Sequence, residues 1–255
     1  MNAEGGFTSL AIVGAAGQMG GLFCQRAEDL GLAVAKVHRQ LAEEELLRLS
    51  RAQLVILSVP VTAMEMVLAR VVPYLSPGAV LADVCSVKAI PLKQMLAAYD
   101  GPVVGTHPLF GPVIPKGFTP RVAVVEGRDP AAARAVSGLF EGMGFFPFSS
   151  TAEEHDRSVA LVQGLNFTTT VAYLAAMRHI PGIEQYVTPS FLRRLESAHK
   201  MLTQDKDLFA ILAETNPYSQ DAVRLFRSYL NLAAGGDTDL LAARAQKWWP
   251  PGGHE

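Results

Sequence analysis

The residue of this sequence best suited to acid–base chemistry is His107, within Gly-Thr-His-Pro-Leu-Phe-Gly-Pro (105–112). An apolar run at 102–105 is typical of a buried strand, and Pro108 and Pro112 stiffen the segment around the histidine. Ligands of α/β sheets bind beyond the carboxyl ends of the strands. An imidazole also has an unperturbed pKa suited to proton transfer near neutral pH. His107 is therefore a candidate catalytic base; the alternative is a structural histidine packed under a proline-rich loop.

A second candidate site is the glycine-rich loop at 14–20, between an apolar run and a helical pattern. It matches the dinucleotide-binding fingerprint if Ala15 takes the place of the first glycine, with Gly17 and Gly20 as the second and third. Gly17 would let the backbone approach a pyrophosphate, and Gly20 would let the helix pack closely on the strand. N–H groups at the helix start would hold the phosphate charge. The predicted cofactor-binding residues of this loop are Gly14, Ala15, Ala16, Gly17, Gln18, Met19 and Gly20.

The end of the second predicted strand bears on the choice of cofactor. Sites that prefer NAD usually place Asp or Glu there to bind the ribose hydroxyls, but this chain has His38 and Arg39. Arg39 could pair with a 2′-phosphate through a charge-assisted hydrogen bond. We therefore expect NADP rather than NAD; alternatively Arg39 is a solvated surface charge.

These candidate residues are positioned by alternating strand and helix patterns in the first half of the chain. The strand candidates are rich in Val, Ile and Leu, and several are apolar throughout, as expected when helices cover both faces of a sheet. They lie at 10–13, 33–37, 54–59, 79–84, 102–105, 122–125 and 145–148, with helical patterns at 19–30, 41–50, 62–74, 91–99 and 130–143. This alternation predicts βαβ units and a parallel sheet.

After residue 150 the strand patterns end. A capped helix start at 150–154 opens a helix towards 178, and further helical patterns cover 189–203, 205–213, 218–234 and 237–248. We predict an α/β protein: a Rossmann-like, doubly wound, mostly parallel sheet at 1–150, followed by an all-helical domain at 151–255 that binds substrate and forms a dimer.

Composition excludes several other classes of protein. The 255 residues are 49% apolar and 18% charged, typical of a compact soluble protein. A net charge of −2 gives no electrostatic basis for binding nucleic acid or an anionic membrane. Cys24 and Cys85 have no ligand-like spacing, so neither a zinc site nor a disulfide framework is expected. We predict no membrane span, no secretory leader and a cytoplasmic location.

Five motifs together resemble the prephenate dehydrogenase (TyrA) family, particularly the enterobacterial type. They are Gly-Gln-Met-Gly (17–20), Ser-Val-Pro (58–60), Ser-Val-Lys (86–88), the segment at 105–112, and Glu-His-Asp (154–156) followed by Gln163. The resemblance implies oxidation of prephenate, or its transaminated relative arogenate, in tyrosine biosynthesis. Hydride passes to the nicotinamide while the ring carboxylate leaves as CO2, giving 4-hydroxyphenylpyruvate or tyrosine.

The resemblance also implies roles for individual residues. His107 draws off the substrate's hydroxyl proton and Ser86 shares that hydroxyl, while Ser58, Val59 and Pro60 join the cofactor site. Ser86 could alternatively cap the helix that begins near Lys88. Lys88 is implied to support the site electrostatically, or alternatively is a surface lysine.

His155 is implied to bind substrate or cofactor, or alternatively is structural. Gln163, eight residues later, would share its helix face. Asp156 would either fix the imidazole of His155 or stabilise a helix N-terminus.

The residues expected to bind the ring carboxylate differ from the family pattern. Lys200 occupies the usual arginine position, five residues before Asp205, and Lys206 replaces the following proline. A second family arginine corresponds to Leu192, so a small helix shift would be needed for Arg193 to serve. Around Asn166 and Phe167, a common family histidine is replaced.

Other readings remain open at this point. The chain could be an arogenate dehydrogenase, a non-catalytic nucleotide-sensing protein, or a generic β-hydroxyacid dehydrogenase with a catalytic lysine. We expect neither a chorismate mutase helix nor a regulatory ACT domain, and the apolar helices after residue 160 predict a homodimer.

Overall fold

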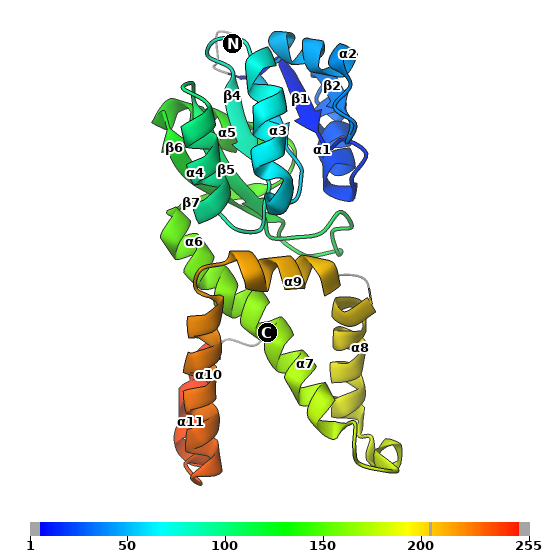
Figure 1. The fold of residues 1–255 in the computed structure, drawn as a ribbon. Coiled ribbons are helices and arrows are strands. Elements are labelled where there is room, and N and C mark those ends of the chain that lie inside the picture. Colours follow the sequence, from blue (N-terminus) through cyan, green and yellow to red (C-terminus); the bar gives the residue numbers. More distant parts are fainter. Residues whose placement is uncertain (1–5, 204–205, 250–255) are drawn as a thin grey trace. The chain divides into compact units, whose positions relative to one another are not determined.

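The computed structural model describes residues 6–203 and 206–249, which divide into two compact units (Figure 1). Unit 1 is Met1–Asp156 and unit 2 is Arg157–Glu255. All seven strands of the described chain belong to unit 1 and form one sheet, in the order β2-β1-β3-β4-β5-β6-β7. Their bounds are β1 Ser9–Val13, β2 Ala33–Val37, β3 Leu54–Leu57, β4 Val80–Asp83, β5 Val103–Pro108, β6 Arg121–Arg128 and β7 Phe146–Ser150.

The sheet is mostly parallel, as predicted. Every neighbouring pair is parallel except β5 and β6, which run antiparallel. The central strands β3, β4 and β5 are buried at every residue, because helices cover both faces, and this is why their sequences are apolar without alternation. Strand order reverses between β1 and β3, so the loop after β1 lies at the topological switch point where such folds bind nucleotides.

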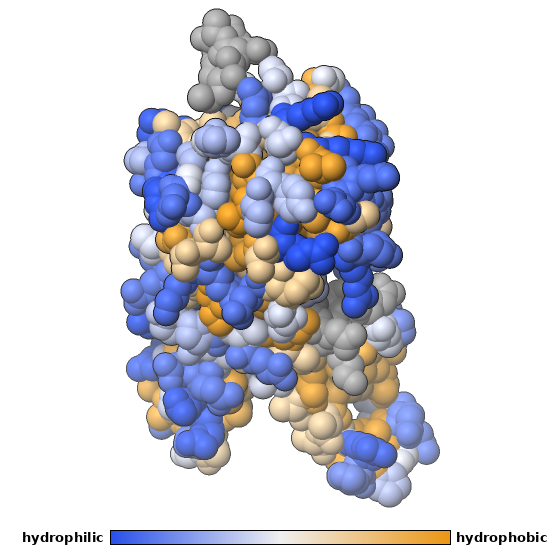
Figure 2. Space-filling model, turned by 45° about the horizontal axis from the view of Figure 1, so that its top comes forward, coloured by the Kyte–Doolittle hydropathy of each residue, from blue (hydrophilic) through white to orange (hydrophobic). Residues whose placement is uncertain are grey.

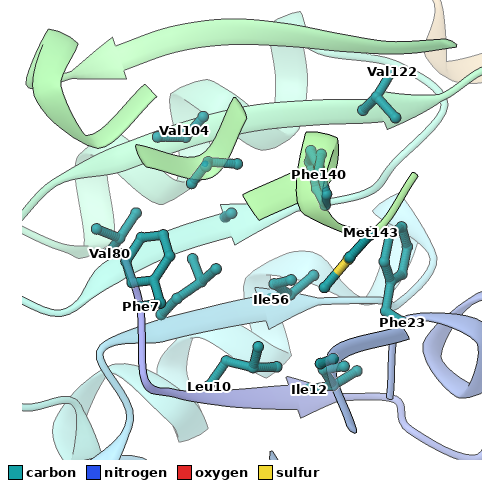
Figure 3. Close-up of a cluster of buried hydrophobic side chains, with 14 of the residues drawn as sticks. Phe7, Leu10, Ile12, Phe23, Ile56, Val80, Val104, Val122, Phe140 and Met143 are labelled. Atoms are coloured by element: carbon teal, nitrogen blue, oxygen red, sulfur yellow. The ribbon is translucent and has the colours of Figure 1, made fainter. Parts of the chain in front are cut away.

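Helices of unit 1 bury the two faces of the sheet. The helices of this unit are α1 Gln18–Asp29, α2 Glu43–Leu46, α3 Met64–Val71, α4 Ala89–Ala98 and α5 Pro130–Gly142, with 3₁₀ segments η1 Leu47–Arg51, η2 Val61–Ala63 and η3 Val72–Tyr74. On one face, α1 and α5 share a core with alternate strand residues. Phe23 and Phe140 meet there with ring centroids 5.7 Å apart, in the same cluster as Ile12 and Ile56 (Figure 3). Helices α3 and α4 pack against each other, and α4 contacts β4 and β5.

The predicted helix at 41–50 is wrong in its length. Leu41 has φ 50° and is buried, and Ala42 is extended, so the helix starts only at Glu43. It gives way to η1 after one turn. Leu41 lies in the left-handed region, which is costly for a branched side chain, and its carbonyl accepts a hydrogen bond from Arg70 at 3.0 Å.

Beyond Ser150 the described residues contain helices and no strand, which confirms the all-helical second part. These elements are α6 Ala152–Val159, η4 Ala160–Leu165, α7 Asn166–Met177, η5 Ile183–Tyr186, α8 Pro189–Thr203, α9 Lys206–Thr215, α10 Ser219–Ala234, α11 Thr238–Ala245 and η6 Gln246–Trp248. Thr151 and Glu154 form the predicted capping box, each backbone N–H donating to the other's side chain at 3.1 Å.

The long helix predicted from 151 to 178 is continuous but not uniform. Its middle section, η4, is π-helical, with a wider turn than the α-helix on either side. Taken together, Ala152–Met177 is the one described helix long and apolar enough to cross a membrane, by length and composition only. A core helix of a soluble protein can meet the same criterion.

Candidate active site

The glycine-rich loop after β1 lies tightly against the loop after β3. Gly14 has φ +89°, and a Cβ there would lie 2.2 Å from the carbonyl oxygen of Ser58. The tight turn is therefore made by Gly14, and Ala15 needs no positive φ. This explains why the fingerprint tolerates alanine at the position where glycine was expected.

Gly20 makes the close approach that its place in the fingerprint predicts. A Cβ on Gly20 would lie 2.2 Å from the carbonyl oxygen of Gly14, so only glycine lets helix α1 begin this close to the loop. Ala16, Gly17 and Gln18 are exposed at the start of α1. This cradle fits a pyrophosphate, because helix-start N–H groups are accessible and no side chain fills the space in front of Gly17.

An acidic side chain does reach the end of β2, although none is present there in sequence. The carboxylate of Glu45, on α2, accepts a hydrogen bond from the backbone N–H of His38 at 2.8 Å and contacts its Nδ1 at 2.6 Å. These hydrogen bonds lower the pKa of the Glu45 carboxyl. Both oxygens of Glu45 are engaged by His38, and the side chain of Arg39 is exposed. The role of Arg39 in cofactor binding stays a prediction.

A row of contacts runs along the carboxyl edge from the glycine loop towards β5. Ser58 donates its backbone N–H to the carbonyl of Val13 at 2.8 Å, and the Cys85 thiol donates to the carbonyl of Val59 at 3.4 Å. Pro60 follows on the same loop and is exposed. The loops after β1, β3 and β4 are thus brought together, as a shared ligand site requires.

Lys88 lies in the interior of the unit, so the alternative of a surface lysine is wrong. Its side chain is 0% exposed, and its ammonium donates to Asp83 Oδ2 at 2.5 Å and to the carbonyl of Thr106 at 2.6 Å. Asp83 Oδ1 in turn accepts from the backbone N–H of Thr106 at 3.2 Å. This ion pair fixes the backbone that leads into His107, and the buried ammonium cannot itself touch a substrate.

The predicted base, His107, is buried within β5 and contacts a second histidine. Its Nδ1 lies 2.9 Å from Nε2 of His155, whose Nδ1 lies 2.7 Å from Oδ1 of Asp156. The prediction that Asp156 fixes the imidazole of His155 is confirmed. His155 is buried, and its two ring nitrogens contact His107 and Asp156. These nitrogens are therefore engaged within the protein and do not face a substrate or cofactor.

Asp156 also caps a helix, but not its own. The backbone N–H groups of Lys88 and Ala89 donate to Oδ1 and Oδ2 of Asp156 at 2.7 and 2.9 Å, at the start of α4. Ser86, the cap suggested by sequence, is half-buried in the loop between β4 and α4. Its alternative role as helix cap is therefore taken by Asp156, 68 residues from Lys88.

The surroundings of His107 favour its neutral form. Burial lowers the pKa of His107 well below 6.5, and the nearby His155 and Lys88 lower it further. A neutral imidazole keeps one unprotonated nitrogen, so His107 stays able to accept a proton through neutral and mildly acidic pH.

The remaining predicted site residues belong to unit 2. Gln163 lies in η4, and because this section is π-helical, its eight-residue spacing from His155 no longer corresponds to two α-helical turns. Its substrate role stays a prediction.

Two predicted cations, Arg193 and Lys200, both lie on α8. Seven residues separate them, which places both on one face of the helix. Arg193 donates to the Ser190 hydroxyl at 3.0 Å, while Arg194 stacks 3.8 Å over the ring of Tyr173. Asp205 lies outside the described residues, as does the side chain of Lys206.

Sequence reasoning missed Glu45 and Asp83. The only sequence signal for Asp83 was an acidic residue at the end of an otherwise apolar strand. Glu45 is the last of three consecutive glutamates, and nothing in the sequence distinguishes it from the other two. Within the described parts of the chain, no group of three or more His, Cys, Asp or Glu residues could hold a metal ion.

Comparison with known proteins agrees with this arrangement. The family model for the nucleotide-binding domain of prephenate dehydrogenase matches residues 23–118. The T-protein of Enterobacter agglomerans is 34% identical over 256 residues, covering 94% of this chain and 67% of that protein. The T-protein of Haemophilus influenzae is 29% identical over 208 residues, covering 79% of this chain and 54% of that protein.

Among solved structures, prephenate dehydrogenase from Aquifex aeolicus in complex with hydroxyphenyl propionate and NAD+ shares the fold. Its TM-score is 0.75 at 18% identity, over 94% of this chain and 95% of that one. The family model covers the loops after β3 and β4 together with His107, and the first T-protein covers nearly the whole chain. The chain belongs to the prephenate dehydrogenase family of oxidoreductases.

Proposed function

We propose that this protein oxidises prephenate to 4-hydroxyphenylpyruvate, with His107 as the base that removes the substrate's hydroxyl proton. The observation that carries the proposal is the buried imidazole of His107 on β5, with its Nδ1 2.9 Å from Nε2 of His155 and its pKa lowered by burial. Loss of CO2 makes the ring aromatic, so the chemistry is strongly downhill. The enzyme has to orient the ring carbon towards the nicotinamide and accept one proton.

The cofactor supplies the hydride acceptor, and the residues of unit 1 supply its cradle. Gly14, Gly17 and Gly20 leave room for a pyrophosphate at the start of α1. We propose that Arg39 pairs with a 2′-phosphate, which favours NADP, since the Glu45 carboxylate is engaged by His38. The loop at 58–60 completes the nucleotide site.

For the substrate, Ser86 is proposed to share the hydroxyl with His107. Arg193 and Lys200 are proposed as the cations for the two carboxylates of prephenate, with Gln163 as a further polar contact. Lysine offers a point charge where arginine offers a planar pair of donors, so Lys200 would orient a carboxylate less strictly than the arginine usual in the family.

The discriminating experiment is a set of four steady-state assays, which combine prephenate or arogenate with NAD+ or NADP+. We expect the highest kcat/KM with prephenate and NADP+. A preference for arogenate would assign the alternative activity, and clearly faster turnover with NAD+ would contradict the role of Arg39. Nucleotide binding without oxidation of either substrate would favour the non-catalytic reading.

We further propose a cytoplasmic homodimer formed through unit 2. Its described helices expose many large apolar side chains, part of the apolar surface seen in Figure 2. They include Leu161, Val162, Tyr173, Leu192, Leu225, Tyr229, Leu230 and Leu240. Exposed apolar side chains that gather into one large patch are typical of an interface, and these side chains support the proposal. Light scattering at micromolar concentration should give twice the chain mass of 27.4 kDa, and a monomer would contradict the proposal.

A further inference from the structure

We infer that His155 and Asp156 form a proton relay behind His107. As Nε2 of His107 takes the substrate's hydroxyl proton, its Nδ1 proton passes to Nε2 of His155, so the positive charge comes to rest beside Asp156. Asp156 is then a positioning residue that acts through His155. This inference rests on the proposed function, because it uses the proton that prephenate releases.

The direction of the relay follows from the hydrogen-bond partners. An ionised carboxylate can only accept, so the contact of 2.7 Å between Asp156 Oδ1 and His155 Nδ1 requires the proton to be on Nδ1. A neutral His155 then has a bare Nε2, which can only accept. The contact of 2.9 Å from this nitrogen to His107 places a proton on Nδ1 of His107. Nε2 of His107 is therefore left unprotonated and able to act as the base.

Asp156 is held firmly in the geometry that this tautomer needs. Both of its oxygens accept a backbone N–H from the start of α4, and its side chain is 0% exposed. Donors to an ionised carboxylate stabilise its charged form, and the α4 N-terminus adds a favourable dipole. The acceptor at the end of the relay is thus fixed by a second helix.

A lone base at the position of His107 would have to hold a positive charge in unfavourable surroundings. His107 is buried and lies close to the ammonium of Lys88, so a positive charge on its ring is unfavourable. His155 is equally buried, but its Nδ1 directly contacts a carboxylate. The Lys88 ammonium is paired with Asp83, so the main gain from moving the charge by one imidazole is the direct contact with the Asp156 carboxylate.

The proton and electron count is complete. The substrate loses hydride to the nicotinamide, CO2 from its ring carboxylate, and its hydroxyl proton. One N–H bond forms at Nε2 of His107, one breaks at its Nδ1 and one forms at Nε2 of His155. The pair of histidines gains one proton in total while decarboxylation leaves a phenolate oxygen. The pair then returns this proton to that oxygen, so 4-hydroxyphenylpyruvate leaves with its hydroxyl group and no net proton is released.

The test is Asp156→Asn, which removes the charge. It keeps one oxygen, in the place of Oδ1, for the N–H of Lys88 and for His155, and it loses the acceptor for the N–H of Ala89. We expect kcat to fall by about 10²-fold, at the lower end of the range for general-base catalysis, with cofactor dissociation constants and KM unchanged within about twofold. The pH profile of kcat should also shift, because the pair loses its charge acceptor. The other charged groups to consider are Lys88 with its partner Asp83 and, on α6 itself, Glu153, Glu154 and Arg157; all are retained.

A double-mutant cycle separates the relay from a capping role. If Asp156 acts through His155, the substitution should cost almost nothing further in a His155→Asn background. Asp129→Asn is the matched control, because Asp129 caps α5 by accepting from the N–H of Ala131 at 2.8 Å. It should leave kcat unchanged.

Imidazole ¹⁵N shifts of the unliganded protein provide a readout that does not depend on activity. We expect protonated Nδ1 and bare Nε2 on both His107 and His155. A protonated Nε2 on neutral His107 would overturn the relay, as would an Asp156→Asn variant with wild-type kcat or one whose defect persists without His155. Failure of the wild-type protein to oxidise prephenate or arogenate would instead refute the proposed function.

Discussion

Replacing His107 with asparagine is expected to lower kcat by about 10²- to 10⁴-fold, the range that a positioned general base contributes. The asparagine amide can still donate to Nε2 of His155, but it has no atom in the position of the histidine Nε2. The hydroxyl proton then loses the base that the proposed mechanism assigns to it. Cofactor binding should be intact, because the glycine loop after β1 is unchanged.

The pH dependence of the wild-type protein gives a second check on His107. Its pKa is lowered by burial, and catalysis needs its neutral form, so kcat/KM should hold as pH falls through 6.5 and decline only at lower pH. Lowering the pH is expected to reduce the stability of the folded protein as well as the rate. An unfolded histidine takes up a proton near pH 6.5, whereas the folded one resists it, so stability is fully present above pH 6.5 and is lost as pH falls towards the folded pKa.

His179 provides a matched control for this substitution, because it is exposed on unit 2. His179→Asn should leave both the rate and the pH profile unchanged. Wild-type turnover in His107→Asn, with correct folding shown by circular dichroism, would refute the mechanism.

Replacing Lys88 with methionine is expected to destabilise the protein by about 3–5 kcal/mol, the usual cost of breaking a buried ion pair from one side. Asp83 and Lys88 are both 0% exposed, so the carboxylate would remain buried without its cation. Chemical denaturation followed by circular dichroism measures this loss. The rate should fall too, because the Thr106 carbonyl beside His107 loses its donor.

Lys93→Met tests whether loss of any α4 lysine has this effect, since Lys93 is exposed on the same helix. Its free energy of unfolding should stay within about 0.5 kcal/mol of the wild-type value. Combining Lys88→Met with Asp83→Asn should cost less than Lys88→Met alone, because neither partner is then left charged. A Lys88→Met protein as stable as the Lys93→Met control would contradict the role of the pair.

The sheet could be predicted from sequence because its signals are local. Each strand is a short apolar run, and the helices between them carry their own periodicity. The helix at 41–50 was overestimated for the opposite reason: the left-handed conformation of Leu41 depends on burial and on Arg70, 29 residues away. The π-helical section η4 could not be predicted either, because the sequence pattern there fits an α-helix.

The candidate site was only partly predictable. His107 and the glycine loop carry recognisable motifs, but the partners that define their chemistry come from distant positions. We expected Asp156 to contact His155 or to stabilise the start of its own helix. It contacts His155 and, in addition, caps α4. For Lys88 the sequence left open electrostatic support of the site or a surface position, and only its pairing with Asp83 shows that it is buried. Long-range pairing of this kind is determined by the sheet order, which no local pattern contains.

The central claim, oxidative decarboxylation with His107 as base, is tested most directly by the stoichiometry of the wild-type reaction. Prephenate and NADP+ are incubated with the protein, and 4-hydroxyphenylpyruvate, CO2 and reduced cofactor are quantified together. We predict equal amounts of all three products, and an initial rate lower by about 10²- to 10⁴-fold for His107→Asn. Formation of no reduced cofactor from prephenate, or equal yields from His107→Asn and the wild-type protein, would contradict it.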